Sequence, residues 1–311
     1  MLERALELAE RGRGTTYPNP VVGAVVLRDG EVVGEGWHEQ KGGPHAEVVA
    51  LEAAGEAARG ATLYVSLEPC THHGRTPPCV DAVLAAGVAH VVAGALDPHP
   101  EHGGGLDRLR AAGVEVELVD SFEARAQNEA WRTWVSRRRP FVTYKAAVTL
   151  DGRVTVPGER WVSGEESRRL VHELRAASDA VAVGMGTVRA DDPRLDARDV
   201  NAARQPRRIA FGHGPLPEGS ELELLGGSLE EELERLAAED VQSLLLEGGP
   251  TLAASFFAAD LVDKLMLFVA PKLSGVGPSL LPALPAPVTL GRLSARPIGD
   301  DVLLIAYVHE P

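Results

Sequence analysis

The chain of 311 residues has a net charge of −14, and 44% of its residues are hydrophobic. This length exceeds what one hydrophobic core usually serves, so we expect two domains. Both halves carry more acidic than basic side chains, which argues against a nucleic-acid-binding protein, while the short hydrophobic runs and the lack of a signal-peptide pattern after Met1 indicate a cytoplasmic one.

The first half alternates helices and strands, beginning with a predicted amphipathic helix over residues 2–11. Asp29-Gly30 separates two strand-like runs, 21–27 and 31–37, and therefore predicts a hairpin. The further elements expected in this half are helix 46–58, strand 61–67, helix 78–86, strand 88–95, helix 106–112, strand 114–119 and helix 122–135. This alternation predicts an α/β layer structure around a mostly parallel sheet.

The chain has only two cysteines, Cys70 and Cys79, and both lie in one proline-bounded loop. With His45 they supply one imidazole and two thiolates, a set that suits zinc and leaves a fourth position open for water. Glu47 is placed to move protons beside the metal, as in zinc deaminases. Eight residues separate the cysteines, where the common deaminase motif has two. The alternative is a core cysteine pair with a surface histidine, and the clustering in one loop argues against it.

A second series of elements begins after the basic run 137–139, which we interpret as a solvated linker. We therefore expect one domain over residues 1–139 and another over residues 140–311. The elements predicted for the second domain are strand 141–148, helix 165–177, strand 179–184, strand 207–212, helix 229–238, strand 241–246, helix 251–258, strand 262–269 and strand 301–308. Residues 270–297 are rich in proline and glycine and are expected to form a long connection to the last strand.

Two glycine turns in the second half follow predicted strands. Glu247–Thr251 leads into a helix with Pro250 as its first residue, so backbone N–H groups there suit a phosphate. Gly184–Thr187 follows the strand that ends at residue 184. Each could be plain turn chemistry, but two such turns at the carboxyl ends of strands in one α/β domain favour a nucleotide site.

The motifs of both halves resemble one family, the bifunctional deaminase-reductases of riboflavin biosynthesis, along nearly the whole chain. The matching stretches of the first half are Thr16–Pro20, Gly34–His38, Pro44–Glu47, Leu67–Cys79, Ala86–Val88 and Asp97–Pro98. Those of the second half are Lys145–Arg153, Gly186–Leu195, Val241–Leu252, Leu261–Asp263 and Ala270–Lys272. The family pattern also accounts for the long spacing between the two cysteines.

This resemblance implies an N-terminal cytidine-deaminase-like three-layer α/β/α domain and a C-terminal dihydrofolate-reductase-like α/β domain. The first would use zinc to deaminate 2,5-diamino-6-ribosylamino-4(3H)-pyrimidinone 5′-phosphate. The second would use NADPH to reduce the ribosyl side chain to ribityl, giving 5-amino-6-ribitylamino-uracil 5′-phosphate. We expect a homo-oligomer that acts on small molecules, without nucleic-acid or membrane partners. The alternative is a zinc deaminase of a nucleoside or nucleic acid with a non-catalytic C-terminal binding module.

The resemblance also implies site residues. Substrate positions of the deaminase fall on Asn19, His38, His72 and Arg75, and those of the reductase fall on Lys145, Arg175, Leu195, Arg198 and Glu247. Cofactor positions fall on Ala147, Trp161, Thr187, Asp191, Gly249, Pro250, Thr251, Leu252, Ala253, Ala254 and Ser255. The segment Gly158–Trp161 departs from the family pattern, because it is one residue shorter and lacks a serine that contacts substrate.

Overall fold

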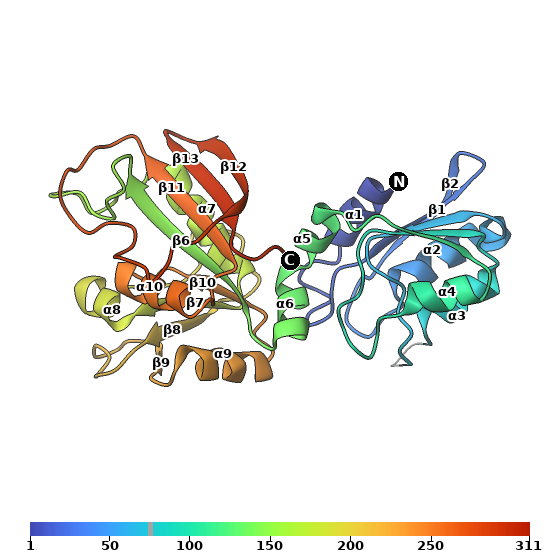
Figure 1. The fold of residues 1–311 in the computed structure, drawn as a ribbon, viewed down its shortest axis with the longest axis horizontal. Coiled ribbons are helices and arrows are strands. Elements are labelled where there is room, and N and C mark those ends of the chain that lie inside the picture. The colour runs from blue at the N-terminus through green and yellow to red at the C-terminus, as the bar shows by residue number, and fades with distance from the viewer. Residues whose placement is uncertain (74–76) are drawn as a thin grey trace. The chain divides into compact units, whose positions relative to one another are not determined.

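The computed structural model describes residues 1–73 and 77–311 and divides into two units, Met1–Arg137 and Arg138–Glu310 (Figure 1). Each unit has its own sheet and its own buried core. No helix in the described part of the chain combines the length and the apolar character needed to cross a bilayer.

The first unit is built on a five-stranded sheet in the order β2-β1-β3-β4-β5. Its strands are β1 (Gly23–Arg28), β2 (Glu31–Trp37), β3 (Thr62–Val65), β4 (His90–Ala93) and β5 (Glu115–Leu118). Strands β3, β4 and β5 are parallel, whereas β1 is antiparallel to both β2 and β3. The sheet is therefore mixed where the sequence predicted a mostly parallel one, because the hairpin inserts β1 between two strands that run the same way.

Helices cover both faces of this sheet. They are α1 (Leu2–Glu10), α2 (Ala46–Ala54), which continues as a 3-10 turn Gly55–Ala58, α3 (Cys79–Ala86), α4 (Gly105–Ala111), α5 (Phe122–Gln127) and α6 (Glu129–Arg137). Side chains alternate along β1, so Val25 packs against α1 on one face, while Ala24 and Val26 join the core under α2, α3 and α4 on the other. The unit is thus a three-layer α/β/α structure.

Two glycines on β2 let α2 approach the sheet directly. A Cβ at Gly34 would lie 2.2 Å from the backbone O of Ala50, and one at Gly36 would lie 2.5 Å from the backbone N of the same residue. Any side chain at either position would collide with the helix backbone. These glycines therefore set the position of α2, whose N-terminal end carries His45 and Glu47.

The second unit has an eight-stranded sheet in the order β12-β13-β11-β6-β10-β7-β8-β9. Its strands are β6 (Phe141–Thr149), β7 (Ala180–Gly184), β8 (Arg207–Phe211), β9 (Glu223–Leu225), β10 (Ser243–Leu246), β11 (Lys264–Ala270), β12 (Gly291–Ile298) and β13 (Asp301–Tyr307). The strands from β11 to β9 are all parallel, and β13 and β12 add an antiparallel hairpin at one edge.

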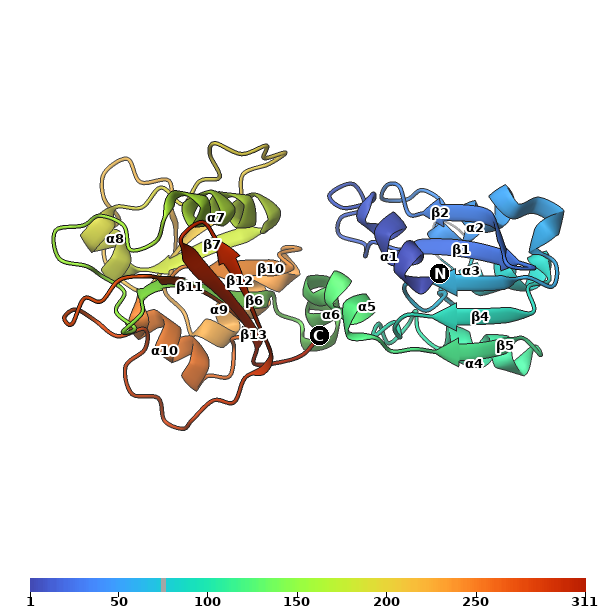
Figure 2. The same ribbon diagram turned by 90° about the horizontal axis from the view of Figure 1, so that it is seen from above.

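The helices of this unit are α7 (Glu165–Ala177), α8 (Met185–Asp191), α9 (Leu229–Ala238) and α10 (Pro250–Ala258). Figure 2 shows α7 on one side of the sheet and α10 on the other. The core clusters agree, because α9 and α10 pack on one face of the parallel strands, while α7 and α8 pack on the other.

Three elements of this unit were missed by the sequence analysis: α8, β9 and β12. The prediction that residues 270–297 form only a connection is wrong at its end, because 291–298 form β12. This edge strand is exposed along almost its whole length and contains Pro297, so it lacks the alternation of buried residues that marks a strand in a sequence.

A buried ion pair ties the start of β6 to the start of β11. Asp263 is 1% exposed, and its carboxylate accepts hydrogen bonds from Arg139 Nη1 and Nη2 at 2.6 and 2.8 Å. The same carboxylate accepts from the backbone N of Val142 at 2.8 Å. Arg139 is itself buried, so the interpretation of the run 137–139 as a solvated linker is wrong for this residue. Each charge of the pair depends on the other for its stabilisation away from water.

Candidate functional site

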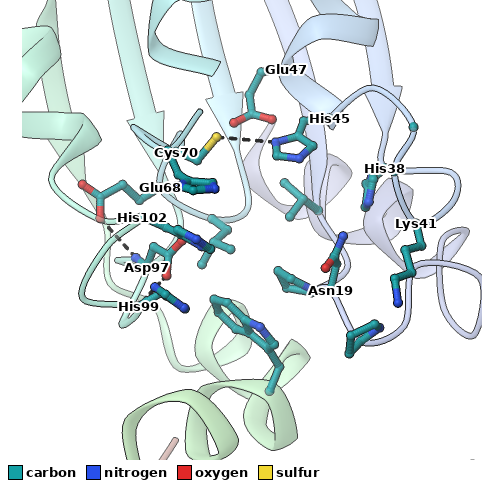
Figure 3. A pocket seen from close by; sticks show the side chains of 18 of the residues that line it. Asn19, His38, Lys41, His45, Glu47, Glu68, Cys70, Asp97, His99 and His102 are labelled. Carbon is teal, nitrogen blue, oxygen red and sulfur yellow. Dashed lines mark hydrogen bonds between the residues drawn. The ribbon is translucent and has the colours of Figure 1, made fainter. Parts of the chain in front are cut away.

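The starts of two helices and one loop of the first unit bring one imidazole and two thiols together. His45 is the N-cap of α2, Cys70 follows β3, and Cys79 is the first residue of α3. His45 Nδ1 lies 3.0 Å from Cys79 Sγ. The same nitrogen lies 3.6 Å from Cys70 Sγ, the contact that a dashed line marks in Figure 3. The three ligand atoms all lie within 4.8 Å of one another.

This donor set fits a zinc ion. Zn–N and Zn–S bonds of about 2.0 and 2.3 Å place neighbouring tetrahedral ligand atoms roughly 3.5 Å apart, close to the spacing here. The Cys79 thiol lowers the pKa of Cys70 by donating a hydrogen bond to its sulfur, which favours the thiolate that a metal needs. With three protein ligands, one coordination position is left for a reactant.

Replacing Cys79 by Ser is expected to remove the metal. Wild-type protein should contain about one zinc per chain, and the variant should lose nearly all of it, because a neutral hydroxyl is a far poorer ligand than a thiolate. Elemental analysis after dialysis measures this directly. The control is Ser66→Ala, a buried substitution directly after β3 that removes no ligand, and this variant should keep its zinc. Equal metal content in wild type and Cys79→Ser would contradict the assignment.

Glu47 lies in the first turn of α2, beside the ligands, and is 3% exposed. Figure 3 shows its carboxylate directed toward Cys70 and His45. Burial raises the pKa of Glu47 to about 7, the range in which a carboxyl group both accepts and releases a proton near neutral pH. The geometry thus places a buried carboxyl group beside the candidate metal ligands.

Two of the three ligands, His45 and Cys70, lie in the wall of a cavity of about 430 Å³. Four further residues expected at the site, Asn19, His38, Glu47 and His72, also line it. Arg75, the remaining deaminase position, lies outside the described residues. A cavity of this size suits a small molecule such as a pyrimidine.

His38 is one of the residues that line this cavity. Its Nδ1 lies 3.0 Å from the backbone O of Pro44, and since a carbonyl only accepts, Nδ1 carries the proton. The other ring nitrogen, Nε2, is buried and has no hydrogen-bond partner among the described residues. Burial lowers the pKa of His38, so the neutral ring offers a lone pair at Nε2.

One wall of the cavity was not foreseen from the sequence. His102 stacks on His99 with ring centroids 3.6 Å apart and lies 4.5 Å from the ring of His72. Asp97, at the start of the same loop, accepts from the backbone N of His99 at 2.7 Å, and burial raises the pKa of Asp97 to about 6. Other lining residues that were missed are Lys41, Glu68, Trp131 and Trp134. These residues could have been found from their position along the chain, because the loops that carry Cys70 and Asp97 follow the adjacent parallel strands β3 and β4.

In the second unit, three residues expected at the reductase substrate form one buried cluster. Glu247 accepts from Arg175 Nε at 2.6 Å and Nη2 at 3.0 Å, and Lys145 Nζ lies 3.2 Å from Glu247 Oε2. Burial alone would raise the pKa of Glu247, but the charges of Lys145 and Arg175 outweigh burial and lower this pKa to about 2. Arg175 Nη1 also donates to the backbone O of Asp196 at 3.1 Å, which links the cluster to the expected residues Leu195 and Arg198.

The two glycine turns meet at the carboxyl ends of the adjacent strands β7 and β10. A Cβ built on Gly249 would lie 3.4 Å from Thr187 Oγ1, and one on Gly184 would lie 3.4 Å from the Leu252 side chain. The beginnings of α8 and α10 are therefore neighbours, as a shared nucleotide site requires. Trp161 is placed differently: it lines a second cavity with Arg168 and Lys272, and none of the other expected cofactor residues is among the described residues that line that cavity.

Glu247→Gln is expected to change how stability depends on pH. The pKa of Glu247 is lowered from 4.5 to about 2 in the folded chain, so its ionisation stabilises the fold above about pH 4.5 and is lost as the pH falls through 2. Between pH 4.5 and 2, the free energy of unfolding in urea should therefore fall by up to about 3 kcal/mol more for the wild type than for the variant. Parallel pH profiles for the two proteins would show that folding does not lower the pKa of Glu247.

These features define a class of protein: a zinc deaminase unit joined to an α/β unit with a nucleotide-type site. Comparison with known proteins agrees. Residues 1–95 match the family described as the cytidine and deoxycytidylate deaminase zinc-binding region, and residues 140–304 match the RibD C-terminal domain.

Full-length relatives identify the family. The chain is 42% identical to the riboflavin biosynthesis protein RibD of Aquifex aeolicus, over 90% of this chain and 88% of that protein, and 40% identical to RibD of Escherichia coli over 97% of each. The solved structure of Acinetobacter baumannii RibD superimposes with a TM-score of 0.83 and 34% identity, covering 98% of this chain and 97% of that one. A Thermotoga maritima structure, described as a diaminohydroxyphosphoribosylaminopyrimidine deaminase/5-amino-6-(5-phosphoribosylamino)uracil reductase, gives the same TM-score and identity.

The chain belongs to the RibD family of riboflavin biosynthesis proteins and is a bifunctional deaminase and reductase. The expected fold class of each half is confirmed by the two domain matches and the full-length structures. The expected cofactors, zinc and NADPH, are confirmed at the level of these two domains, and the zinc ligand set is present in the structure.

Proposed function

We propose that the deaminase domain, residues 1–139, acts on 2,5-diamino-6-ribosylamino-4(3H)-pyrimidinone 5′-phosphate through His45, Cys70, Cys79 and Glu47. The observation that carries this is the convergence of the three ligand atoms within 4.8 Å of one another, at a cavity that His45, Cys70 and the buried Glu47 line. When bound, zinc supplies a Lewis acid that lowers the pKa of water. Glu47 then accepts a proton from the attacking water and delivers it to the departing amino group, which leaves as ammonia.

The cavity also supports roles for residues that hold the pyrimidine. His38 Nε2 is an acceptor for an N–H group of the ring, since the tautomer fixed by Pro44 leaves its lone pair open. Figure 3 shows Asn19 on the same side of the cavity as His38, where its amide can read a second polar group. His72 and Arg75 are the other proposed substrate residues, for contact with the ring, the ribose or the phosphate.

In the reductase domain, residues 140–311, the proposed substrate residues are Lys145, Arg175, Leu195, Arg198 and Glu247. When bound, NADPH supplies a hydride to the ribosyl carbon. The cofactor residues proposed to hold it are Ala147, Trp161, Thr187, Asp191 and the start of α10, Gly249–Ser255. Glu247 keeps Lys145 and Arg175 in place as cations, and Lys145 is the proposed proton donor. Holding the two reactants in register is the main requirement of hydride transfer.

A coupled assay tests both halves of this proposal. Purified protein incubated with the diaminopyrimidine phosphate should release ammonia without NADPH, and should then oxidise an equal amount of NADPH once it is added. Cytidine serves as the control substrate and should remain unchanged. Ammonia release without subsequent NADPH oxidation would refute the reductase assignment, and turnover of cytidine or single-stranded DNA would favour the nucleoside or nucleic-acid alternative.

We also propose a cytoplasmic homo-oligomer. Free thiol ligands require a reducing compartment. Leu273, Val276 and Leu293 on the second unit expose 76%, 56% and 69% of their surface, and covering such apolar side chains favours association. Light scattering that gives the mass of a monomer would exclude the oligomer.

A further inference from the structure

Residues 194–198, here called the arginine segment, are anchored by two side chains that the proposed mechanism does not use. Gln205 binds Ala197 twice, because its Oε1 accepts from the backbone N and its Nε2 donates to the backbone O, both at 2.8 Å. His172, on α7, places its Nδ1 3.1 Å from the backbone O of Asp196. The backbone of the segment is thus held by one side chain from α7 and by one from the loop before β8.

The segment needs such anchoring because its backbone is strained. Leu195 has a φ of +54°, and among the described non-glycine residues with positive φ it is the one with an apolar side chain. A bulky residue rarely adopts this left-handed conformation unless its surroundings determine it. The Leu195 side chain is 2% exposed and packs in the core beside Val183 and Met185.

This conformation places two arginines around one carboxylate. Arg198 Nη1 lies 2.5 Å and Arg194 Nη2 3.3 Å from the carboxylate oxygens of Asp196. Both guanidiniums are substantially exposed, whereas Asp196 is mostly buried. Without substrate, one carboxylate therefore offsets only one of the two positive charges, and a phosphate ester with its greater charge can replace the carboxylate on Arg198.

His172 acts on this segment through a hydrogen bond. Burial is the main cause that lowers the pKa of His172, and the nearby charges of Arg175 and Arg198 lower it further, while Asp196 opposes them. A neutral ring whose Nδ1 contacts a carbonyl donates through Nδ1–H. The ring therefore restrains the backbone and adds no charge to the site.

We propose that His172 and Gln205 are positioning residues of the reductase: they hold the arginine segment against its backbone strain and thereby fix Arg198 where the phosphate ester of the substrate binds. This inference rests on the proposed function, in which Arg198 contacts the substrate. It predicts that the two side chains control recognition of the phosphate group and leave the chemistry at the ribosyl carbon unchanged.

The test compares the phosphorylated reductase substrate with its dephosphorylated form in NADPH oxidation. His172→Leu and Gln205→Leu should each raise KM for the phosphorylated substrate about tenfold, with kcat retained, and leave the dephosphorylated substrate unaffected. His172→Asn should restore most of the loss, because its amide reaches the position of Nδ1. Ser178→Ala, which removes another side-chain bond to the backbone at the end of α7, should behave as wild type.

An equal loss for both substrates, or no loss in either Leu variant, would overturn the positioning role. Failure of the proposed function gives a different result, namely a wild type that oxidises no NADPH. In that case calorimetric binding of the same two pyrimidines replaces the kinetic measurement, and the Leu variants should weaken only the phosphorylated one. A wild type that binds both forms equally would overturn the inference on its own.

Discussion

Glu47→Gln is expected to retain zinc and lose deamination. The amide is nearly isosteric with the carboxylate but neither accepts a proton from water nor delivers one to the leaving amine. Loss of general acid-base catalysis should lower kcat between about 10² and 10⁴-fold, with a small change in KM. Ammonia release from the diaminopyrimidine phosphate measures the rate, and elemental analysis verifies the metal.

The control for this experiment lies on the same helix. Glu52→Gln, on the exposed side of α2, removes a carboxylate of the same kind outside the cavity and should keep wild-type turnover. Glu47→Gln with wild-type kcat and full zinc occupancy would remove the proton-transfer role. Loss of zinc together with activity would show instead that Glu47 supports the metal site.

Asp263→Ala should lower the free energy of unfolding of the second unit more than the other substitutions do. It leaves the buried guanidinium of Arg139 without its counter-charge and removes the acceptor for the backbone N of Val142. Breaking one side of a buried ion pair costs about 3–5 kcal/mol. Urea unfolding followed by fluorescence should show the loss in the transition of the second unit, while ammonia release by the first unit persists.

Two comparisons separate this effect from a generic loss of an ion pair. Asp107→Ala removes the exposed partner of Arg110, and such a surface pair contributes about 0–1 kcal/mol. The double variant Arg139→Met with Asp263→Leu removes both charges and should recover much of the stability lost in Asp263→Ala. If Asp263→Ala were as mild as Asp107→Ala, the buried pair would not stabilise the second unit.

The zinc site was accessible from the sequence because its chemistry is local to two motifs. His45 and Glu47 share one helix start, and the two cysteines flank one loop, so residue type and spacing were sufficient to predict the ligands. The opposite wall was not accessible in this way. His99 and His102 carry no motif, and they reach the cavity only because β4 pairs with β3 and aligns the loops that follow both strands.

The fold shows the same division between local and long-range information. Strands with buried alternation or continuous apolar runs, such as β7 and β10, were recognisable from composition. The strand β12 was not, because its side chains remain exposed and it is defined by backbone pairing with β13. The antiparallel pairing of β1 with β3 was likewise not recognisable, because β3 lies far from β1 along the chain.

The close packing of α2 on Gly34 and Gly36 has a consequence for how the deaminase can diverge. An added methyl on either glycine would displace the whole helix, so the ligand and the proton carrier at its end would shift together as a rigid group. Enlargement of the cavity for bulkier heterocycles must therefore begin elsewhere, at rings such as His99 whose replacement leaves the helix axis where it is. Laboratory selection for new amine substrates should accumulate changes in the loop after β4 before any on β2.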